Sequence, residues 1–205
     1  MSARDIRAAM TPSPRMFAAL LALTLVGCAK SPRALYESTL DDQTELVVVN
    51  KHLGTALRMR ATYLSDTFRA QMAAERKRLI DATDEDDASF IRRMQDDGSA
   101  YHEVVLTVET DLVDQEVTLG TTDDGWKLRL VADGVEQPLV TVYKVAEPNP
   151  LHHGLYAYLN LWNELWIARF QKVTTSPTEL VLKVGSGFGH GEVHWTGAQL
   201  GAPAP

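Results

Sequence analysis

Cysteine is almost absent: the sequence of 205 residues contains a single one, Cys28. One thiol cannot form a disulfide within the chain, and it cannot supply the cysteine cluster of a structural zinc site. The protein must therefore rely on an ordinary hydrophobic core. The chain is long enough to bury such a core in a single domain.

Long apolar runs are lacking as well. The run Met16–Val26 is much shorter than the roughly 20 apolar residues that a helix needs to cross a bilayer. Arg4, Arg7 and Arg15 precede it, so the segment combines the basic start and the short apolar centre of a secretory signal peptide. This segment is therefore predicted to be removed and not to span a membrane.

The apolar run ends in Leu25–Cys28 (LVGC), which resembles the lipobox of bacterial lipoproteins. The resemblance implies that a signal peptide, residues 1–27, is cleaved between Gly27 and Cys28. It also implies that Cys28 then carries a diacylglyceryl group and an acyl chain, typically palmitate. Two or more such chains hold a protein stably on a membrane. In the alternative, an ordinary secreted protein would be cleaved near Ala29 and would lose the cysteine.

Lipidation of Cys28 would place the protein in the bacterial cell envelope and leave no thiol for nucleophilic catalysis. In proteobacterial lipoproteins an aspartate after the cysteine causes retention in the inner membrane. Ala29 occupies that position here, which favours the outer membrane over the inner one. Residues 28–43 are polar and contain proline, and they are predicted to form a lipidated tether.

Basic residues are in the minority. Without residues 1–27, the chain has 17 basic and 26 acidic residues, a net charge of −9. An acidic domain is a poor match for nucleic acid and would not be attracted to an anionic lipid surface. We therefore expect no nucleic-acid partner, and we expect membrane contact through the N-terminal lipid alone.

Short β-branched or alternating segments after the tether predict strands. They cover residues 44–50, a segment ending near 64, and residues 101–110, 126–131, 139–145, 164–173, 179–184 and 192–195. One or two helices are expected, at about 66–82 and 84–97, and Ser65 would cap the first. We therefore predict a mainly β protein, an antiparallel β-sandwich of about seven strands over residues 44–198 with the helices inserted. A disordered tail is expected at 199–205.

Four stretches of the chain carry a second resemblance. They are ATYLSDTFR (Ala61–Arg69), WKLRL (Trp126–Leu130), LWNELWIARF (Leu161–Phe170) and EVHW (Glu192–Trp195). Together they resemble uncharacterised lipoproteins of proteobacteria over most of the mature chain. The resemblance brings no activity with it, so it implies no catalytic or binding residue.

Histidine spacing does not favour a metal site. His190 and His194 would lie about 13 Å apart on a single strand. Zinc ligands lie about 2.0–2.1 Å from the ion, so these two could share one only across a tight bend. With His152 and His153, they are interpreted as ordinary turn and strand residues. No metal and no cofactor is predicted.

Other chemical motifs also fail on spacing. The glycine-rich segment Gly185–Gly191 lacks the pattern of a dinucleotide loop and the lysine of a P-loop. Ser186 is not in a nucleophile elbow, because Val184 stands where the first glycine belongs. We interpret the segment as a hairpin before the last strand. Acidic residues such as Asp84–Asp87 fall in turns or at a helix start and are interpreted as solvated, so no catalytic residue is predicted.

The aromatic residues offer a possible contact surface. Tyr156, Tyr158, Trp162 and Trp166 all fall at even positions, so they would share one face if their segment were a single strand. Such a row could stack on sugar rings or meet a partner protein. Apolar residues such as Leu159 occupy the opposite face, which favours burial of the row in the core instead.

These observations favour a lipid-anchored envelope protein that acts as a non-catalytic binding or assembly module, with another envelope protein as its partner. One alternative is a carbohydrate-contacting domain, which exposure of Trp162 or Trp166 would support. The other is an envelope hydrolase, which would need a pocket with convergent carboxylates or histidines.

Overall fold

The structure is a computed structural model, and it describes residues 31–52, 54–111, 117–120 and 125–201. The chain divides into two compact units, residues 1–31 and 32–205. The predicted signal peptide, its cleavage point at Gly27 and the lipidation site Cys28 lie outside the described residues.

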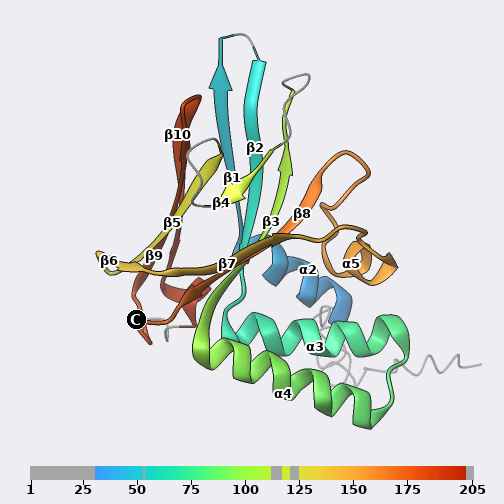
Figure 1. The fold of residues 1–205 in the computed structure, drawn as a ribbon. Coiled ribbons are helices and arrows are strands. Elements are labelled where there is room, and N and C mark those ends of the chain that lie inside the picture. The colour runs from blue at the N-terminus through green and yellow to red at the C-terminus, as the bar shows by residue number, and fades with distance from the viewer. Residues whose placement is uncertain (1–30, 53, 112–116, 121–124, 202–205) are drawn as a thin grey trace, which may run out of the picture. The chain divides into compact units, whose positions relative to one another are not determined.

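Two sheets form the β part of the fold (Figure 1). Sheet A has the strand order β1-β2-β3-β8-β7, and sheet B has the order β10-β9-β5-β4, with β6 paired to β5. Neighbouring strands are antiparallel except β4 and β5, which are parallel. The strands are β1 (Thr44–Lys51), β2 (Gly54–Tyr63), β3 (Tyr101–Glu109), β4 (Leu119–Gly120), β5 (Trp126–Ala132), β6 (Val135–Gln137), β7 (Leu139–Lys144), β8 (Glu164–Gln171), β9 (Glu179–Ser186) and β10 (Gly189–Thr196).

The main hydrophobic core lies between the two sheets. Alternate residues of the longer strands point into it, as Leu57 and Met59 do in β2. Trp195 is fully buried there, and its Nε1 donates a hydrogen bond to the carbonyl oxygen of Gln43 at 2.9 Å. The expected pair of packed, mostly antiparallel sheets is confirmed, but each sheet has five strands.

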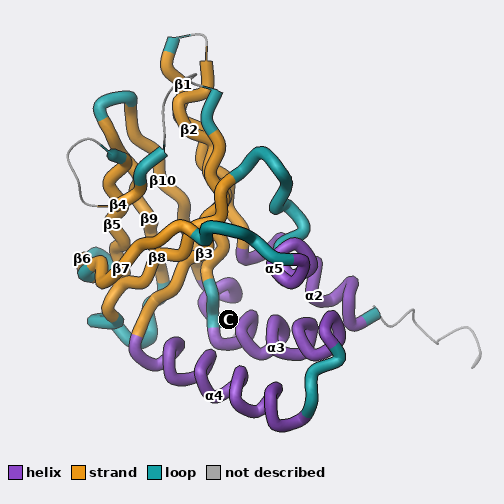
Figure 2. Tube along the Cα trace, turned by 45° about the vertical axis from the view of Figure 1, so that its right-hand side comes forward, coloured by secondary structure: helices purple, strands orange, loops and turns teal. Residues whose placement is uncertain are grey.

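Four α-helices of the described chain form a further layer, so the fold is mixed α/β and not mainly β (Figure 2). They are α2 (Pro32–Gln43), α3 (Asp66–Ile80), α4 (Asp84–Ala100) and α5 (Pro150–Leu155). A second core takes Tyr36, Phe68 and Leu155 from α2, α3 and α5. It packs on Val105 and Leu165, which lie on the face of sheet A turned away from sheet B, here called the outer face.

Residues 32–43, predicted as part of a polar tether, form helix α2, so that prediction is wrong. The helix buries Tyr36, Leu40 and Gln43, which are four and three residues apart and therefore lie on one face. The remaining positions are mostly polar. The segment resembles a tether in composition because only one narrow stripe of it reaches the core.

No helix is predicted from the sequence at residues 150–155, where the structure has α5. Its start has a local cause. The side chain of Asn149 accepts a hydrogen bond from the backbone N–H of His152 at 3.1 Å, and Pro150 suits the first helical position. Helices are therefore not confined to the insertion between β2 and β3.

The tail expected to be disordered at 199–205 begins inside the folded domain, in the 3₁₀ helix η2 (Gly197–Leu200). The side chain of Gln199 donates from Nε2 to the carbonyl oxygen of Asp42 at 2.6 Å. The prediction is wrong for this part of the segment, and residues 202–205 lie outside the described chain.

Helices α3 and α4 confirm the two predicted helices. The hydroxyl oxygen of Ser65 accepts a hydrogen bond from the backbone N–H of Phe68 at 3.3 Å, as expected of an N-cap. Thr83 caps α4 in the same way, and the acidic run Asp84–Asp87 forms its first turn, where carboxylates oppose the helix dipole.

A buried ion pair joins these helices to sheet A. Nη2 of Arg69 lies 3.2 Å from Oε2 of Glu103 on β3, and both side chains are buried. Arg69 also donates to the carbonyl oxygens of Leu64 at 3.0 Å and Met94 at 3.4 Å. Gly98 of α4 gives it room, since a Cβ there would lie 3.2 Å from Cδ and Nε of Arg69. One guanidinium therefore contacts β3, α4 and the chain before α3.

The predicted glycine-rich hairpin between β9 and β10 is confirmed, and its glycines have a packing role. A Cβ on Gly191 would lie 2.7 Å from Cγ1 of Val47, and a Cβ on Gly189 would lie 2.8 Å from Cγ1 of Val49. The missing side chains let β10 approach β1, at the edge where the two sheets come together. The glycines thus serve sheet closure.

Replacing Gly191 by alanine should destabilise the fold, because the new Cβ needs space that the buried side chain of Val47 occupies. Overpacking of this kind typically costs about 1–3 kcal/mol. Gly187→Ala is the matched control, since nothing lies within 4 Å of a Cβ at that position of the same hairpin. Urea denaturation of both variants measures the difference. Equal free energies of unfolding would contradict the close approach of β1 and β10.

Candidate functional site

The aromatic residues predicted as a contact surface do not share one face. Residues 156–163 form the connection between α5 and β8 and are not a strand. Side-chain directions alternate only in extended chain, and this connection turns. The prediction that Tyr156, Tyr158, Trp162 and Trp166 lie in one row is therefore wrong, and each has its own environment.

Tyr156 and Trp166 are buried, in different cores. The hydroxyl of Tyr156 points to Sδ of Met72 at 3.5 Å, inside the helical core. Burial raises the pKa of Tyr156 well above its usual value, so the phenol stays neutral. Trp166 lies between the sheets, and its Nε1 donates to Oε2 of Glu164 at 3.1 Å. Both residues serve the fold.

Tyr158 holds the connection against the outer face of sheet A. Its hydroxyl is hydrogen-bonded to the hydroxyl of Thr62, and its ring centroid lies 5.9 Å from Cζ of Arg60. Burial raises the pKa of Tyr158 to about 12. It is therefore an internal support for the residues that follow it.

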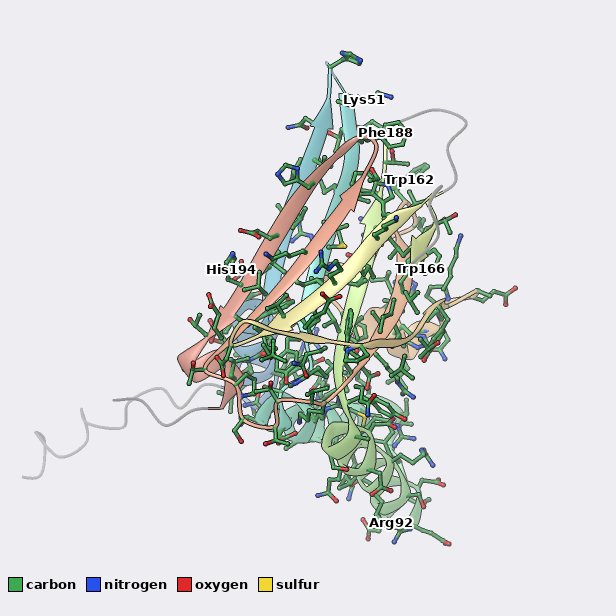
Figure 3. All side chains as sticks on the ribbon, turned by 60° about the vertical axis from the view of Figure 1, so that its left-hand side comes forward. Lys51, Arg92, Trp162, Trp166, Phe188 and His194 are labelled. Carbon is green, nitrogen blue, oxygen red and sulfur yellow. The ribbon has the colours of Figure 1, made fainter. Side chains whose placement is uncertain are left out.

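Trp162 and its neighbour Leu161 are the exposed members of the segment, with 85% and 91% of their surfaces accessible. The turn that carries them is well held. Oδ1 of Asn160 accepts hydrogen bonds from the backbone N–H groups of Trp162 at 2.7 Å and Asn163 at 3.2 Å. In return, Asn163 accepts from the backbone N–H of Asn160 at 3.0 Å and donates to the carbonyl oxygen of Tyr158 at 3.1 Å. An ordered turn thus presents two large apolar side chains to solvent, and Figure 3 labels one of them, Trp162.

A shallow depression of about 180 Å³ adjoins this turn on the outer face of sheet A. It is lined by Leu46, Arg58, Arg60, Thr107, Glu109 and Asn163. Arg58 and Glu109 form an ion pair across β2 and β3, and Leu46 is 49% exposed. We call Leu161, Trp162 and these six residues together the Trp162 surface. It combines exposed apolar groups with guanidinium, carboxylate, hydroxyl and amide groups.

The histidines considered as metal ligands are not brought together. His190 and His194 lie on β10, and the ring nitrogens of His194 are each 3.3 Å from a carboxylate oxygen, one of Glu179 and one of Glu192. The pair His152–His153 belongs to α5. Within the part of the chain that the structure describes, no group of three or more His, Cys, Asp or Glu could hold a metal ion.

His102 on β3 is a buried histidine that sequence reasoning missed. Its Nδ1 lies 3.0 Å from the hydroxyl oxygen of Tyr63, and its Nε2 lies 3.0 Å from the carbonyl oxygen of Thr174. Burial lowers the pKa of His102 to about 4, so the ring is neutral at pH 7. The neutral ring then donates from Nε2 and accepts at Nδ1. With both nitrogens engaged, His102 stabilises the fold and is not a free base.

A larger hollow, of about 730 Å³, lies between α3 and α4. Its middle is lined by Ala70, Ala73 and Ala74 of α3 and by Ile91 and Met94 of α4. Sequence reasoning missed this groove. The available signal was the helical spacing of the three alanines, which places small side chains where larger ones would close the gap.

No helix among the described residues combines the length and the apolar character needed to cross a bilayer. Neither a protein-family model nor a curated protein matches the sequence. A solved structure, a novel protein of unknown function from Burkholderia pseudomallei K96243, is similar to this chain with a TM-score of 0.42. The two share 11% sequence identity, and the match covers 94% of this chain and 96% of that chain. Similarity at this level carries no argument about function.

The exposure of Trp162 predicts a simple spectroscopic result. The sequence contains four tryptophans, and the other three, Trp126, Trp166 and Trp195, are at most 8% exposed. Iodide should therefore quench the emission of Trp162 alone, and Trp162→Phe should make the remaining emission nearly insensitive to iodide. Trp166→Phe is the control and should leave the quenchable fraction in place. Quenching that survives Trp162→Phe would show that the turn is not presented to solvent as described.

Proposed function

We propose that this protein is a lipid-anchored, non-catalytic binding module of the bacterial cell envelope, which contacts a partner protein through the Trp162 surface. The observation that carries the proposal is the exposure of Leu161 and Trp162 on an ordered turn. Tryptophan and arginine are enriched among the residues that dominate protein interfaces. The surface supplies both, because Arg58 and Arg60 line the adjoining depression.

The preorganised turn also favours binding. Ordering a flexible loop on association costs free energy. A turn that is already held by hydrogen bonds avoids this cost. Asn160 and Asn163 supply those bonds before any partner arrives. Covering the exposed indole and the Leu161 side chain would then contribute apolar burial at about 25 cal/mol per Å².

The anchor part of the proposal rests on the lipobox-like Leu25–Cys28. If Cys28 carries the lipid, Ala29, Lys30 and Ser31 alone separate it from the start of α2. Three extended residues span at most about 11 Å. The anchored domain would then stay close to the membrane surface, which raises its effective concentration around other envelope proteins. The outer membrane remains the favoured location because Ala29 replaces the aspartate typical of inner-membrane retention.

A carbohydrate-contacting domain is the second candidate. The exposure of Trp162 favours it, because aromatic rings stack on sugar rings and the neighbouring Asn163 and Arg58 could bond hydroxyl groups. An envelope hydrolase is less favoured. Two carboxylates line the α3–α4 groove, Asp66 near Gly98 at one end and Asp87 near Lys77 at the other. The lining of α3 from Asp66 to Lys77 is about 17 Å long at 1.5 Å per residue. Paired catalytic carboxylates need a separation of roughly 5–9.5 Å.

The anchor is tested at Cys28. Cys28→Ala should abolish labelling by radioactive palmitate and leave an unprocessed precursor or a soluble form, because no other cysteine is available to carry the diacylglyceryl group. Wild-type protein and Cys28→Ala are compared in membrane fractions. Unlabelled wild type, or a variant that partitions with membranes as the wild type does, would overturn the lipoprotein assignment.

The contact surface is tested by photo-crosslinking in intact cells. A photoreactive amino acid at Leu161 should yield an adduct with one envelope protein, and Trp162→Ala in the same chain should reduce its yield at least about tenfold, which corresponds to about 1.4 kcal/mol. The same photoreactive group at Val173, which is 55% exposed but lies beyond β8, is the control and should not yield that adduct. Equal adducts from both positions would contradict the proposal, and competition by a cell-wall saccharide would favour the second candidate.

A further inference from the structure

The groove between α3 and α4 is separate from the Trp162 surface. The two helices are joined by the short link 81–83 and lie side by side below the sheets (Figures 1 and 2). The hollow between them has a volume of about 730 Å³, within the range of about 300–1,000 Å³ typical of small-molecule sites. A ligand in this hollow would therefore bind independently of a protein partner at the Trp162 surface.

The middle of the groove is apolar and poorly filled. Ala70 and Ala74 of α3 are exposed to it, and Ile91 and Met94 of α4 are only half-buried. Gly98 is the one buried residue of α4. Protein interiors are normally close-packed, so a helix pair that leaves this much space exposes apolar surface that a ligand could cover.

The dimensions of the groove limit what fits. Its lining on α3 runs from Asp66 to Lys77, about 17 Å at 1.5 Å per residue. An α-helix with its side chains is about 10–12 Å wide. An acyl chain is narrower, and it spans about 15 Å, half of a hydrocarbon core about 30 Å thick. The groove therefore matches one acyl chain in length.

The two ends of the groove differ in charge. At one end Nζ of Lys77 is 2.8 Å from Asp84 and 3.8 Å from Asp87, which leaves an excess of negative charge. At the other end Nζ of Lys172 donates to the carbonyl oxygen of Gly98 at 2.6 Å, and no described carboxylate lies within ion-pair distance of it. The hydroxyls of Ser99 and Thr175 line the same end.

The second end also contains Asp66 and Arg69. Arg69 is already paired with the buried Glu103. Lys172 is thus the cation left for a ligand. Asp66 balances its charge at this end, whereas two aspartates face the one lysine at the Lys77 end, so an anionic group is better placed beside Lys172. We propose that the groove binds a single-chain amphiphile, a long-chain fatty acid, with its tail between α3 and α4 and its carboxylate at Lys172.

The test uses laurate and the mature chain, residues 28–205, carrying Cys28→Ala so that no attached lipid competes. Calorimetry on delipidated protein should show one laurate bound per chain. Ala74→Leu should weaken binding at least tenfold because the added side chain fills the groove, and leucine keeps the helix intact. Ala88→Leu is the matched control, since Ala88 is exposed on α4 and does not line the groove.

The contact between the carboxylate and Lys172 is tested separately. Lys172→Gln should weaken laurate binding several-fold, whereas it should not change the affinity for dodecanol, which has the same tail and no charge. Equal loss of both ligands would overturn the placement of the carboxylate at Lys172. An absence of laurate binding to the folded Cys28→Ala chain with an unaltered groove, or unchanged binding by Ala74→Leu with an unaltered urea midpoint, would overturn the site itself. Crosslinking from Leu161 is unaffected by either result, so failure here is distinguishable from failure of the proposed function.

Discussion

The buried ion pair between Arg69 and Glu103 is the contact on which the helical layer depends. Two charges removed from water are costly, and removing one partner of such a pair typically destabilises a protein by about 3–5 kcal/mol. Here the cost is offset by further bonds: Arg69 also bonds two carbonyl oxygens, and Arg169 lies 3.6 Å from the second oxygen of Glu103 and 2.9 Å from Asp97 of α4. The network holds α3 and α4 on β3 and β8. Arg69 also lines the α3–α4 groove. Pairing the buried Arg69 thus fixes α3 and α4 on sheet A at the end of the groove that this residue lines.

The helical layer covers only part of the outer face of sheet A. Where α2, α3 and α5 lie, residues such as Val105 and Leu165 are buried in a second core. Beyond them the sheet carries Leu46 and Val48, which are 49% and 43% exposed, and Leu46 lines the depression beside the turn with Trp162. Tyr158 lies at the border, since its carbonyl oxygen accepts a hydrogen bond from Asn163 of the turn while its hydroxyl bonds Thr62 on the sheet. The Trp162 surface therefore lies on the uncovered part of the sheet, whereas the groove lies between two helices of the layer itself.

Much of the fold could be predicted because its signals are local. The alternation of Leu57 and Met59 with arginines indicates a strand with one buried face. Ser65 indicates a helix start, because its hydroxyl bonds the backbone N–H of a residue only three positions later. The errors share a physical reason as well. Helix α2 is hard to recognise in the sequence because polar residues separate its three buried ones. Helix α5 is hard to recognise because it has only six residues and its start depends on one asparagine and one proline. The prediction that the aromatic residues share one face was wrong because it assumed an extended chain, whereas the segment turns.

By itself the sequence determined the features that depend on neighbouring residues: the lipobox-like motif that predicts lipidation at Cys28, the strand periods, the helix caps and the glycine-rich hairpin. It also bounded the chemistry, because spacing alone argued against a nucleotide loop or a shared metal on one strand. Only the tertiary structure decided that Trp166 is buried between two sheets while Trp162, four residues earlier, is exposed. It also decided that Gly191 makes room for Val47 and that three alanines of α3 border a groove. Each of these outcomes depends on atoms contributed by distant segments, and burial is a property of what packs against a side chain, not of the side chain alone.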